Sequence, residues 1–457
     1  MTTTRKIAEF VAGLTLDDVP SRAIEIVKGG IIDALGAAIA GTGTDAAQVF
    51  TRWAREVGGG EHAGIIGGSF KTSPQTAARV NGTLGQALDF DPPNPLLPVL
   101  LALGEFANSS GRDVLEAYVA GFEVQSKLQT GVSAKHYAHG WHSNAVFGTI
   151  GATAAAAKLL KLDAGKTCMA IGIATSEAAG VRQNLGTMTK PYHAGAAAAN
   201  GIIAATLARH GMTGASDGLE GEYGLLNVFA QRGEYDAHQI AETFGAPWNL
   251  LAHEIRIKPY PCCRASHRAL DAILALCAKN RIVPEKITGI ECEVSAHVTQ
   301  LMAYASATHA LEAKFCLPYC LAVAVCDGRA GLRQFTDERV GDARVQALAA
   351  RVRVLHADGR SEWDTGSMLP CTVRIHCNDG SVLEANAGAP KGDRANPIRM
   401  DEIREKYREC THDLLSGEHI NAILTTIDGL ESRRDLRVLY DILTFGIRVK
   451  HSTQQAV

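Results

Sequence analysis

Lys190 is the residue whose surroundings in the sequence best suit acid–base chemistry. It precedes Pro191, which suits the first turn of a helix, and it lies between two stretches with helical periodicity. We therefore expect Lys190 at or just before a helix N-terminus, where unpaired backbone N–H groups can hold a carboxylate. The positive end of the helix disfavours an ammonium, which makes the amine a better base for removing a proton next to a carboxylate. The alternative to a catalytic role is that Lys190 is a solvated lysine in a loop, beside a structural glycine turn.

Three histidines follow one another at three-residue steps: His136, His139 and His142. On a helix they would share one face and could bind a metal ion. Gly140 disfavours a regular helix, and no Asp, Glu or Cys stands close by, so we predict no metal site here. The alternative is that Tyr137 and His142 point into a pocket as proton donors or substrate ligands. In the structural alternative, Trp141 anchors the core and the histidines lie on the surface.

Two later segments carry further candidate residues. Residues 258–267 are predicted to leave a strand and enter a helix near Ser266, so that His267 in the first turn could meet an anion. A lone histidine is more often structural. The adjacent Cys262 and Cys263 are expected to be free thiols, because neighbouring cysteines rarely form a disulfide. Residues 312–319 are predicted to lie at the start of a helix. By themselves they indicate little about function.

Composition excludes several classes of function. The 457 residues include 45 Lys and Arg against 48 Asp and Glu, which gives no basic patch for nucleic acid or an anionic membrane. No apolar run is long enough to span a bilayer, and no signal-peptide core follows the N-terminal residues. Eleven cysteines without a secretory signal suit a cytoplasmic location. Phosphate-loop, dinucleotide-binding, nucleophile-elbow and zinc-protease motifs are missing, so we predict no cofactor.

Periodicity predicts two domains. Helical spacing recurs over residues 20–41, 73–90, 96–108, 111–132, 143–160, 164–180 and 192–210. Strand alternation begins at 287–298 and returns at 351–355, 372–377 and 382–385, with helices at 264–280 and 310–326 between the strands. Helical patterns resume after residue 397. We therefore expect a mainly α protein, with a helical domain of residues 1–254 and 394–457 and an α+β domain of residues 255–393.

Together these segments resemble the MmgE/PrpD family, which includes 2-methylcitrate dehydratase, cis-aconitate decarboxylase and iminodisuccinate epimerase. The matching stretches occur in family order over most of the chain: 81–83 with 87–91, 140–143, 186–191, 258–261 and 312–315. The resemblance implies a large helical domain with a smaller α+β lid domain, a homodimer, and a small polycarboxylate as substrate. It places Asp89, His142, Lys190, His267 and Tyr319 at family active-site positions, and we add Arg182 and Gln183, which open the Lys190 segment, as substrate contacts.

The chain departs from the family pattern at two places. After Asp91 the family usually continues with a short loop and a His-Pro pair, whereas here a Pro-rich run leads directly into Leu96. Ala196 stands where many relatives place an Arg, which removes one possible carboxylate contact.

The missing histidine bears on the reaction. Dehydration and decarboxylation both need a strong general acid, whereas epimerisation needs only a proton acceptor and a proton donor on opposite faces. We therefore predict a cofactor-independent epimerase that uses Lys190 and Tyr137 as the pair and most resembles iminodisuccinate epimerase. A 2-methylcitrate dehydratase or cis-aconitate decarboxylase, and a catalytically silent carboxylate-binding protein, are the alternatives.

Overall fold

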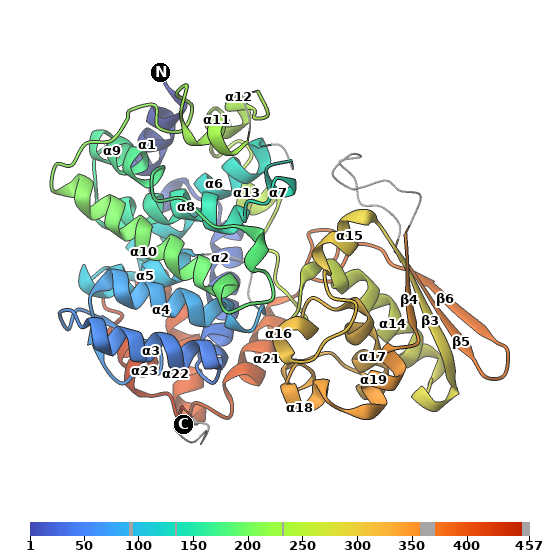
Figure 1. The fold of residues 1–457 in the computed structure, drawn as a ribbon. Helices are drawn as coiled ribbons and strands as arrows, with labels where there is room; N and C mark the ends of the chain where they lie inside the picture. The colour runs from blue at the N-terminus through green and yellow to red at the C-terminus, as the bar shows by residue number, and fades with distance from the viewer. Residues whose placement is uncertain (91–94, 133–134, 231–232, 357–370, 450–457) are drawn as a thin grey trace. The chain divides into compact units, whose positions relative to one another are not determined.

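A computed structural model describes residues 1–90, 95–132, 135–230, 233–356 and 371–449, and it confirms a mainly α fold with little β-structure (Figure 1). The chain forms two compact units. The helical unit consists of Met1–Ala87, Asp91–Ile255 and Arg399–Val457. The α+β unit consists of Arg256–Ile398 together with Leu88–Phe90, a short segment that periodicity did not assign to it.

The helical unit is built mostly from helices that follow the predicted periodicity. In its N-terminal part these are α1 (Thr3–Gly13), α2 (Ser21–Gly41), α3 (Asp45–Val57), α4 (Pro74–Ala87), α5 (Leu96–Phe106), α6 (Gly111–Gly131), α7 (Lys135–Ala138), α8 (Ser143–Leu159), α9 (Ala164–Ala174) and α10 (Thr189–Arg209). Shorter helices follow: α11 (Leu225–Phe229), α12 (Ala237–Ala241) and α13 (Asn249–Ala252). The C-terminal helices are α21 (Met400–Thr411), α22 (Gly417–Asp428) and α23 (Arg437–Phe445). A two-stranded antiparallel pair, β1 (Ala63–Gly64) and β2 (Lys71–Thr72), lies between α3 and α4 in the sequence.

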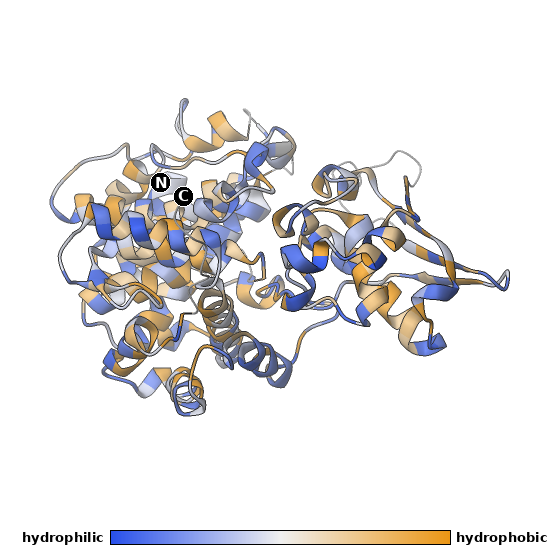
Figure 2. Ribbon diagram, turned by 60° about the horizontal axis from the view of Figure 1, so that its bottom comes forward, coloured by the Kyte–Doolittle hydropathy of each residue, from blue (hydrophilic) through white to orange (hydrophobic). Residues whose placement is uncertain are grey.

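Hydrophobic and hydrophilic patches alternate along the helices, as amphipathic packing requires (Figure 2). Side-chain caps begin several of these helices. Asp163 accepts a hydrogen bond from the backbone N–H of Lys166 at the start of α9, and Ser110 and Asp113 form a capping box at the start of α6. No helix in the described part of the chain is long and apolar enough to cross a membrane.

Helices α4 and α10 approach each other closely at two glycines. A Cβ atom on Gly82 would lie 2.8 Å from the Cα of Gly195, and a Cβ on Gly195 would overlap the carbonyl oxygen of Arg79. The helices run in opposite directions, since Arg79 Nη2 donates to Asn200 Oδ1 at 3.2 Å on one side of this contact and Lys190 bonds Gln86 on the other. Small residues thus bring two backbones together.

The C-terminal helices belong to the helical unit because α21 packs along α2. The Asp33 carboxylate on α2 is fully buried and forms an ion pair with Lys406 Nζ at 2.7 Å. The Tyr407 side chain lies against Gly36, where a Cβ would be 3.2 Å from the ring. The chain therefore returns to its first core after the α+β unit.

The α+β unit contains one four-stranded sheet with the order β4-β3-β5-β6. The strands are β3 (Ile287–Val294), β4 (Val352–His356), β5 (Thr372–Cys377) and β6 (Val382–Asn386). Strand β3 pairs with β4 in parallel and with β5 in antiparallel register, Cys292 lying opposite Val354 and Val373. Helices α14 (His267–Asn280) and α17 (Leu317–Asp327) pack on this sheet, and the shorter α15 (Ala296–Leu301), α16 (Ala310–Ala313), α18 (Asp337–Val340) and α19 (Ala343–Ala349) complete the unit.

Two local predictions were wrong. Residues 254–258 form no strand before Lys258, because the chain there runs as irregular structure into the 3-10 helix Arg264–Ser266. The stretch 310–326 is not one helix, since it breaks between α16 and α17 at residues 314–316. In both places apolar composition resembled a regular element, but Pro259, Pro261 and Pro318 interrupt backbone hydrogen bonding.

We predict that Gly195→Ala lowers the free energy of unfolding by about 1–3 kcal/mol, because the added methyl group has no space between α4 and α10. Urea denaturation measures this loss. The matched control is Gly13→Ala at the end of α1, where a Cβ would meet nothing within 4 Å, and this variant should be neutral or slightly stabilised. Equal stabilities of the two variants would contradict the packing assigned to Gly195.

Candidate functional site

Lys190 is a buried residue in the first turn of α10. This placement excludes the solvated-loop alternative and confirms the expected helix N-terminus. Its Nζ donates a hydrogen bond to Gln86 Oε1 at 3.0 Å, near the end of α4. Because a buried ammonium must be compensated by polar or charged partners, few structural roles favour a lysine at this position.

His142 and His193 form a direct imidazole pair beside Lys190. Their Nδ1 atoms lie 2.9 Å apart, and both side chains are buried. His193 lies one turn after Lys190 on α10, whereas His142 is the N-cap residue of α8. Burial, with a smaller contribution from the positive charge of Lys190, lowers the pKa of His193. The helical unit therefore places a lysine ammonium and two imidazoles in one buried cluster, which we call the Lys190 cluster: Gln86, His142, Lys190 and His193.

His193 was not selected from the sequence. Its spacing of three residues from Lys190 puts both on one face of a helix, so helical periodicity could have identified it. Its pairing with His142, fifty-one positions earlier, depends on the tertiary fold.

A short backbone ladder brings the His142 and Arg182 segments together. The His142 N–H donates to Gly180 O at 3.0 Å, and the Arg182 N–H donates to Gly140 O at 2.8 Å. Trp141 lies opposite Val181 in this antiparallel bridge. The predicted substrate contacts at Arg182 and the start of α8 are thus held side by side by main-chain bonds.

Tyr137 is half-buried in α7 and contacts Arg182. The guanidinium carbon lies 4.2 Å from the centre of the tyrosine ring, and Arg182 Nη1 donates to the Tyr137 carbonyl at 2.8 Å. Gln183 is exposed. Of the predicted proton-transfer pair, Lys190 contacts Gln86 and Tyr137 contacts Arg182. The catalytic role of the pair stays a prediction.

Asp89 forms a buried ion pair within the α+β unit. Lys258 Nζ lies 2.9 Å from Asp89 Oδ1 and 3.0 Å from the Asp89 carbonyl oxygen. Asp89 has a φ of 52°, a left-handed conformation that Asp tolerates better than most residues. Lys314 Nζ donates to the carbonyls of Leu88 and Pro261, at 2.7 and 2.9 Å. Two buried lysines that the sequence analysis did not select thus hold the segment that carries Asp89.

His267 and Tyr319 are both buried in the α+β unit. His267 begins α14, and its Nε2 lies 3.2 Å from the Cys262 carbonyl, which can only accept. Its buried Nδ1 has no hydrogen-bond partner among the described residues. The Tyr319 hydroxyl donates to the Gln334 carbonyl, and burial strongly raises the pKa of Tyr319. Packing and these bonds account for both residues, while their predicted substrate contacts stay predictions.

The three histidines do not form the shared helical face that a metal site would need. Helix α7 ends at Ala138, and Gly140 has a φ of 98°, so His136 and His142 belong to different elements. Within the described ranges, no group of three or more His, Cys, Asp or Glu side chains could hold a metal ion.

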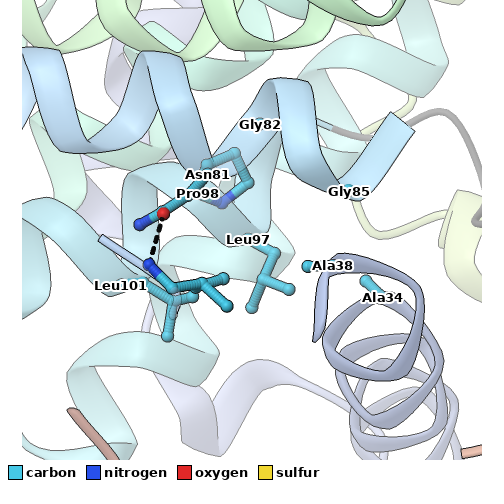
Figure 3. A pocket seen from close by; sticks show the side chains of 9 residues that line it. Ala34, Ala38, Asn81, Gly82, Gly85, Leu97, Pro98 and Leu101 are labelled. Atoms are coloured by element: carbon cyan, nitrogen blue, oxygen red, sulfur yellow. Dashed lines mark hydrogen bonds between the residues drawn. The ribbon is translucent and has the colours of Figure 1, made fainter. Parts of the chain in front are cut away.

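One small cavity in the helical unit lies between α2, α4 and α5 (Figure 3). Its wall is apolar apart from Asn81, whose Oδ1 accepts from the Ile66 N–H at 2.9 Å and whose Nδ2 donates to Gly64 O at 3.0 Å. The Asn81 side chain therefore holds the β1 segment, and the cavity offers no group for catalysis.

Comparison with known proteins places the chain among enzymes over nearly its whole length. The MmgE/PrpD N-terminal domain matches residues 5–238, and the MmgE/PrpD C-terminal domain matches residues 260–431. Cis-aconitate decarboxylase of Mus musculus is 28% identical over 96% of this chain and 93% of its own length. The human enzyme of the same name is 27% identical over 96% and 94%, and that of Aspergillus terreus is 26% identical over 97% and 96%.

His136 should make the stability of the protein depend on pH. Burial against the Phe147 ring lowers its pKa to about 4, against about 6.5 in an unfolded chain. Between these values the unfolded chain binds more protons, so its contribution is complete above pH 6.5 and is lost as the pH falls towards 4. In urea titrations from pH 7 to 4.5, His136→Phe should show a shallower loss of stability than the wild type. The exposed His210→Phe should retain the wild-type slope, and a His136→Phe variant that does the same would contradict this assignment.

Lys314→Met should destabilise the α+β unit. The change leaves the carbonyls of Leu88 and Pro261 without their ammonium donor, at a cost of about 1–3 kcal/mol for each buried acceptor. Thermal unfolding followed by circular dichroism should show a lower Tm for this variant. Lys279→Met, on the exposed side of α14, is the control, and equal melting of the two variants would exclude the structural role of Lys314.

Proposed function

Because the chain belongs to the MmgE/PrpD family, we propose that it is a lyase for a small polycarboxylate, with cis-aconitate decarboxylation as the first reaction to test. The observation that carries this proposal is the Lys190 cluster, in which a buried ammonium lies on the same helix face as one of two paired imidazoles. Supporting it, relatives named cis-aconitate decarboxylase align over nearly the whole chain.

The Lys190 cluster suits the charges of such a reaction. A substrate carboxylate would pair with the Lys190 ammonium at the N-terminus of α10, where the helix dipole adds attraction. In decarboxylation the C–C bond to another carboxylate breaks, CO₂ leaves, and the electron pair moves into an allylic carbanion conjugated with a remaining carboxylate. A proton from His142 then forms the new C–H bond, and water returns a proton to the imidazole. The ammonium stabilises the negative charge throughout.

The epimerase prediction takes second place. It rested on a missing general acid, and the buried His142–His193 pair supplies a group of that kind. The Pro-rich run after Asp91, where the family pattern led us to expect a His-Pro pair, begins at residues 91–94, which lie outside the described residues. Nothing among the relatives favours iminodisuccinate over cis-aconitate.

Proton NMR in D₂O separates the three family reactions when cis-aconitate, 2-methylcitrate and iminodisuccinate are supplied singly. Release of one CO₂ per cis-aconitate, with one deuterium in the product, supports decarboxylation. Loss of water from 2-methylcitrate keeps the lyase class but changes the substrate. Deuterium at the α-carbon of iminodisuccinate with inversion, and no reaction of the other two compounds, overturns the lyase proposal.

Lys190→Met should lower kcat/KM for the true substrate by about 100-fold or more, because the carboxylate loses its buried counter-charge. The side chains are of similar size, so circular dichroism should show an intact fold. Lys166→Met, at an exposed position on α9, is the control and should retain wild-type kinetics. Near-normal activity of Lys190→Met would remove the lysine from the mechanism.

A further inference from the structure

We propose that Gln86 is a positioning residue that directs the Lys190 ammonium towards the substrate carboxylate. The geometry behind this proposal is the hydrogen bond from Lys190 Nζ to Gln86 Oε1 at 3.0 Å, which joins two buried side chains. The consequence for catalysis rests on the proposed function, whereas the effect of Gln86 on the position of the ammonium does not.

The chemistry of the two groups fixes which one donates. A lysine ammonium has three N–H donors and no acceptor, so the Gln86 atom that faces it must be the amide oxygen. The direction of this bond therefore follows from the groups themselves and needs no choice of tautomer. With one N–H of Lys190 bonded to Gln86, rotation about the last bonds of the lysine side chain is restricted.

The backbone that carries Gln86 is held firmly against α10. Gln86 is the penultimate residue of α4 and follows Gly82 by one turn, while Lys190 precedes Gly195 on α10. A Cβ on Gly82 would lie 2.8 Å from the Gly195 Cα, so the two backbones touch. Asn81 of the same helix is bonded to the β1 segment. The amide oxygen of Gln86 is therefore a fixed point relative to the first turn of α10.

A lysine needs such a fixed point more than most residues do. Its four-carbon stem has many rotamers, and ordering them when a substrate binds costs conformational entropy. A hydrogen bond that is already present in the folded protein removes part of this cost beforehand. The position also matters for the rate, because a misplacement of about 1 Å in an active site can lower it by about 100-fold.

The Asp89–Lys258 pair of the α+β unit shows another way to hold a buried lysine. There the acceptor, at 2.9 Å, is a carboxylate, and the two charges form an ion pair. The Gln86 amide accepts a hydrogen bond without adding a negative charge. A carboxylate at position 86 would keep the hydrogen bond but would compete with the substrate for the ammonium. Glutamate and methionine match glutamine in length, so substitution by each separates the effect of the charge from that of the hydrogen bond.

Crystal structures of the wild type and of Gln86→Met test the positioning without substrate. In the wild type, Lys190 Nζ should lie within hydrogen-bond distance of Gln86 Oε1. In Gln86→Met the ammonium should move by about 1 Å or more while the backbones of α4 and α10 stay in place, because methionine offers no comparable acceptor. A Lys190 Nζ that keeps its position in Gln86→Met would overturn the proposal, whatever the substrate is.

Kinetics with the family substrate that reacts, cis-aconitate first, test the consequence for catalysis. Gln86→Met should lower kcat by about 10- to 100-fold with a smaller change in KM, because a misplaced ammonium still attracts the carboxylate but stabilises the transition state poorly. Gln86→Glu keeps the acceptor and should instead raise KM by about 10-fold or more. Calorimetry with the unreactive tricarboxylate tricarballylate should show weaker binding to Gln86→Glu than to the wild type.

Gln75→Met and Gln75→Glu, at the exposed start of α4, are the matched controls and should leave kcat, KM and tricarballylate binding unchanged. Parallel losses in Gln86→Met and Gln86→Glu, with kcat and KM affected alike, would assign Gln86 a packing role only. An active Lys190→Met would contradict the proposed function instead, and the crystal structures would still decide whether Gln86 holds the ammonium. If Gln86→Met does not fold, Gln86→Asn takes its place, since it withdraws the acceptor by one methylene group.

Discussion

The close approach of α4 and α10 is the constraint on which the candidate site depends. Gly82 and Gly195 allow the two backbones to touch, and no side chain larger than hydrogen fits between them. Because the helices are antiparallel, this contact sets which residues face each other one turn away, where Gln86 meets Lys190. His193 lies on the same stretch of α10 and therefore reaches His142 at the start of α8. A local steric fact thus determines the arrangement of the Lys190 cluster.

Buried lysine ammonium groups occur in both units. Lys190 in the helical unit, and Lys258 and Lys314 in the α+β unit, all lose most of their hydration. Each ammonium is compensated by oxygen atoms: an amide, a carboxylate with its own carbonyl, and two carbonyls, respectively. The Asp89–Lys258 contact is an ion pair.

The sequence and the structure favour different reaction classes for this protein. The sequence after Asp91 lacks the His-Pro pair that the family resemblance led us to expect, and from this a mechanism without a strong acid was inferred. The fold places His142 against His193, fifty-one residues later, and so provides a buried imidazole pair in the helical unit. The sequence analysis named His142 as a candidate proton donor, but its pairing with His193 could not be read from the sequence. Motifs that the family shares, such as residues 186–191, were informative because they combine a helix start with a basic residue.

The sequence by itself determined most of the long helices, the four strands of the larger sheet and the placement of Lys190 in a first helical turn, because these follow from local periodicity and proline geometry. It also determined the family, since the shared segments keep their order along the chain. It did not determine that Leu88–Phe90 belongs to the α+β unit, that Lys258 and Lys314 hold that segment, or that two histidines share a hydrogen bond. These features are contacts between residues far apart in the chain. Only tertiary packing decided them, because a side chain's charge state and hydrogen-bond partner depend on which backbone segments exclude water around it.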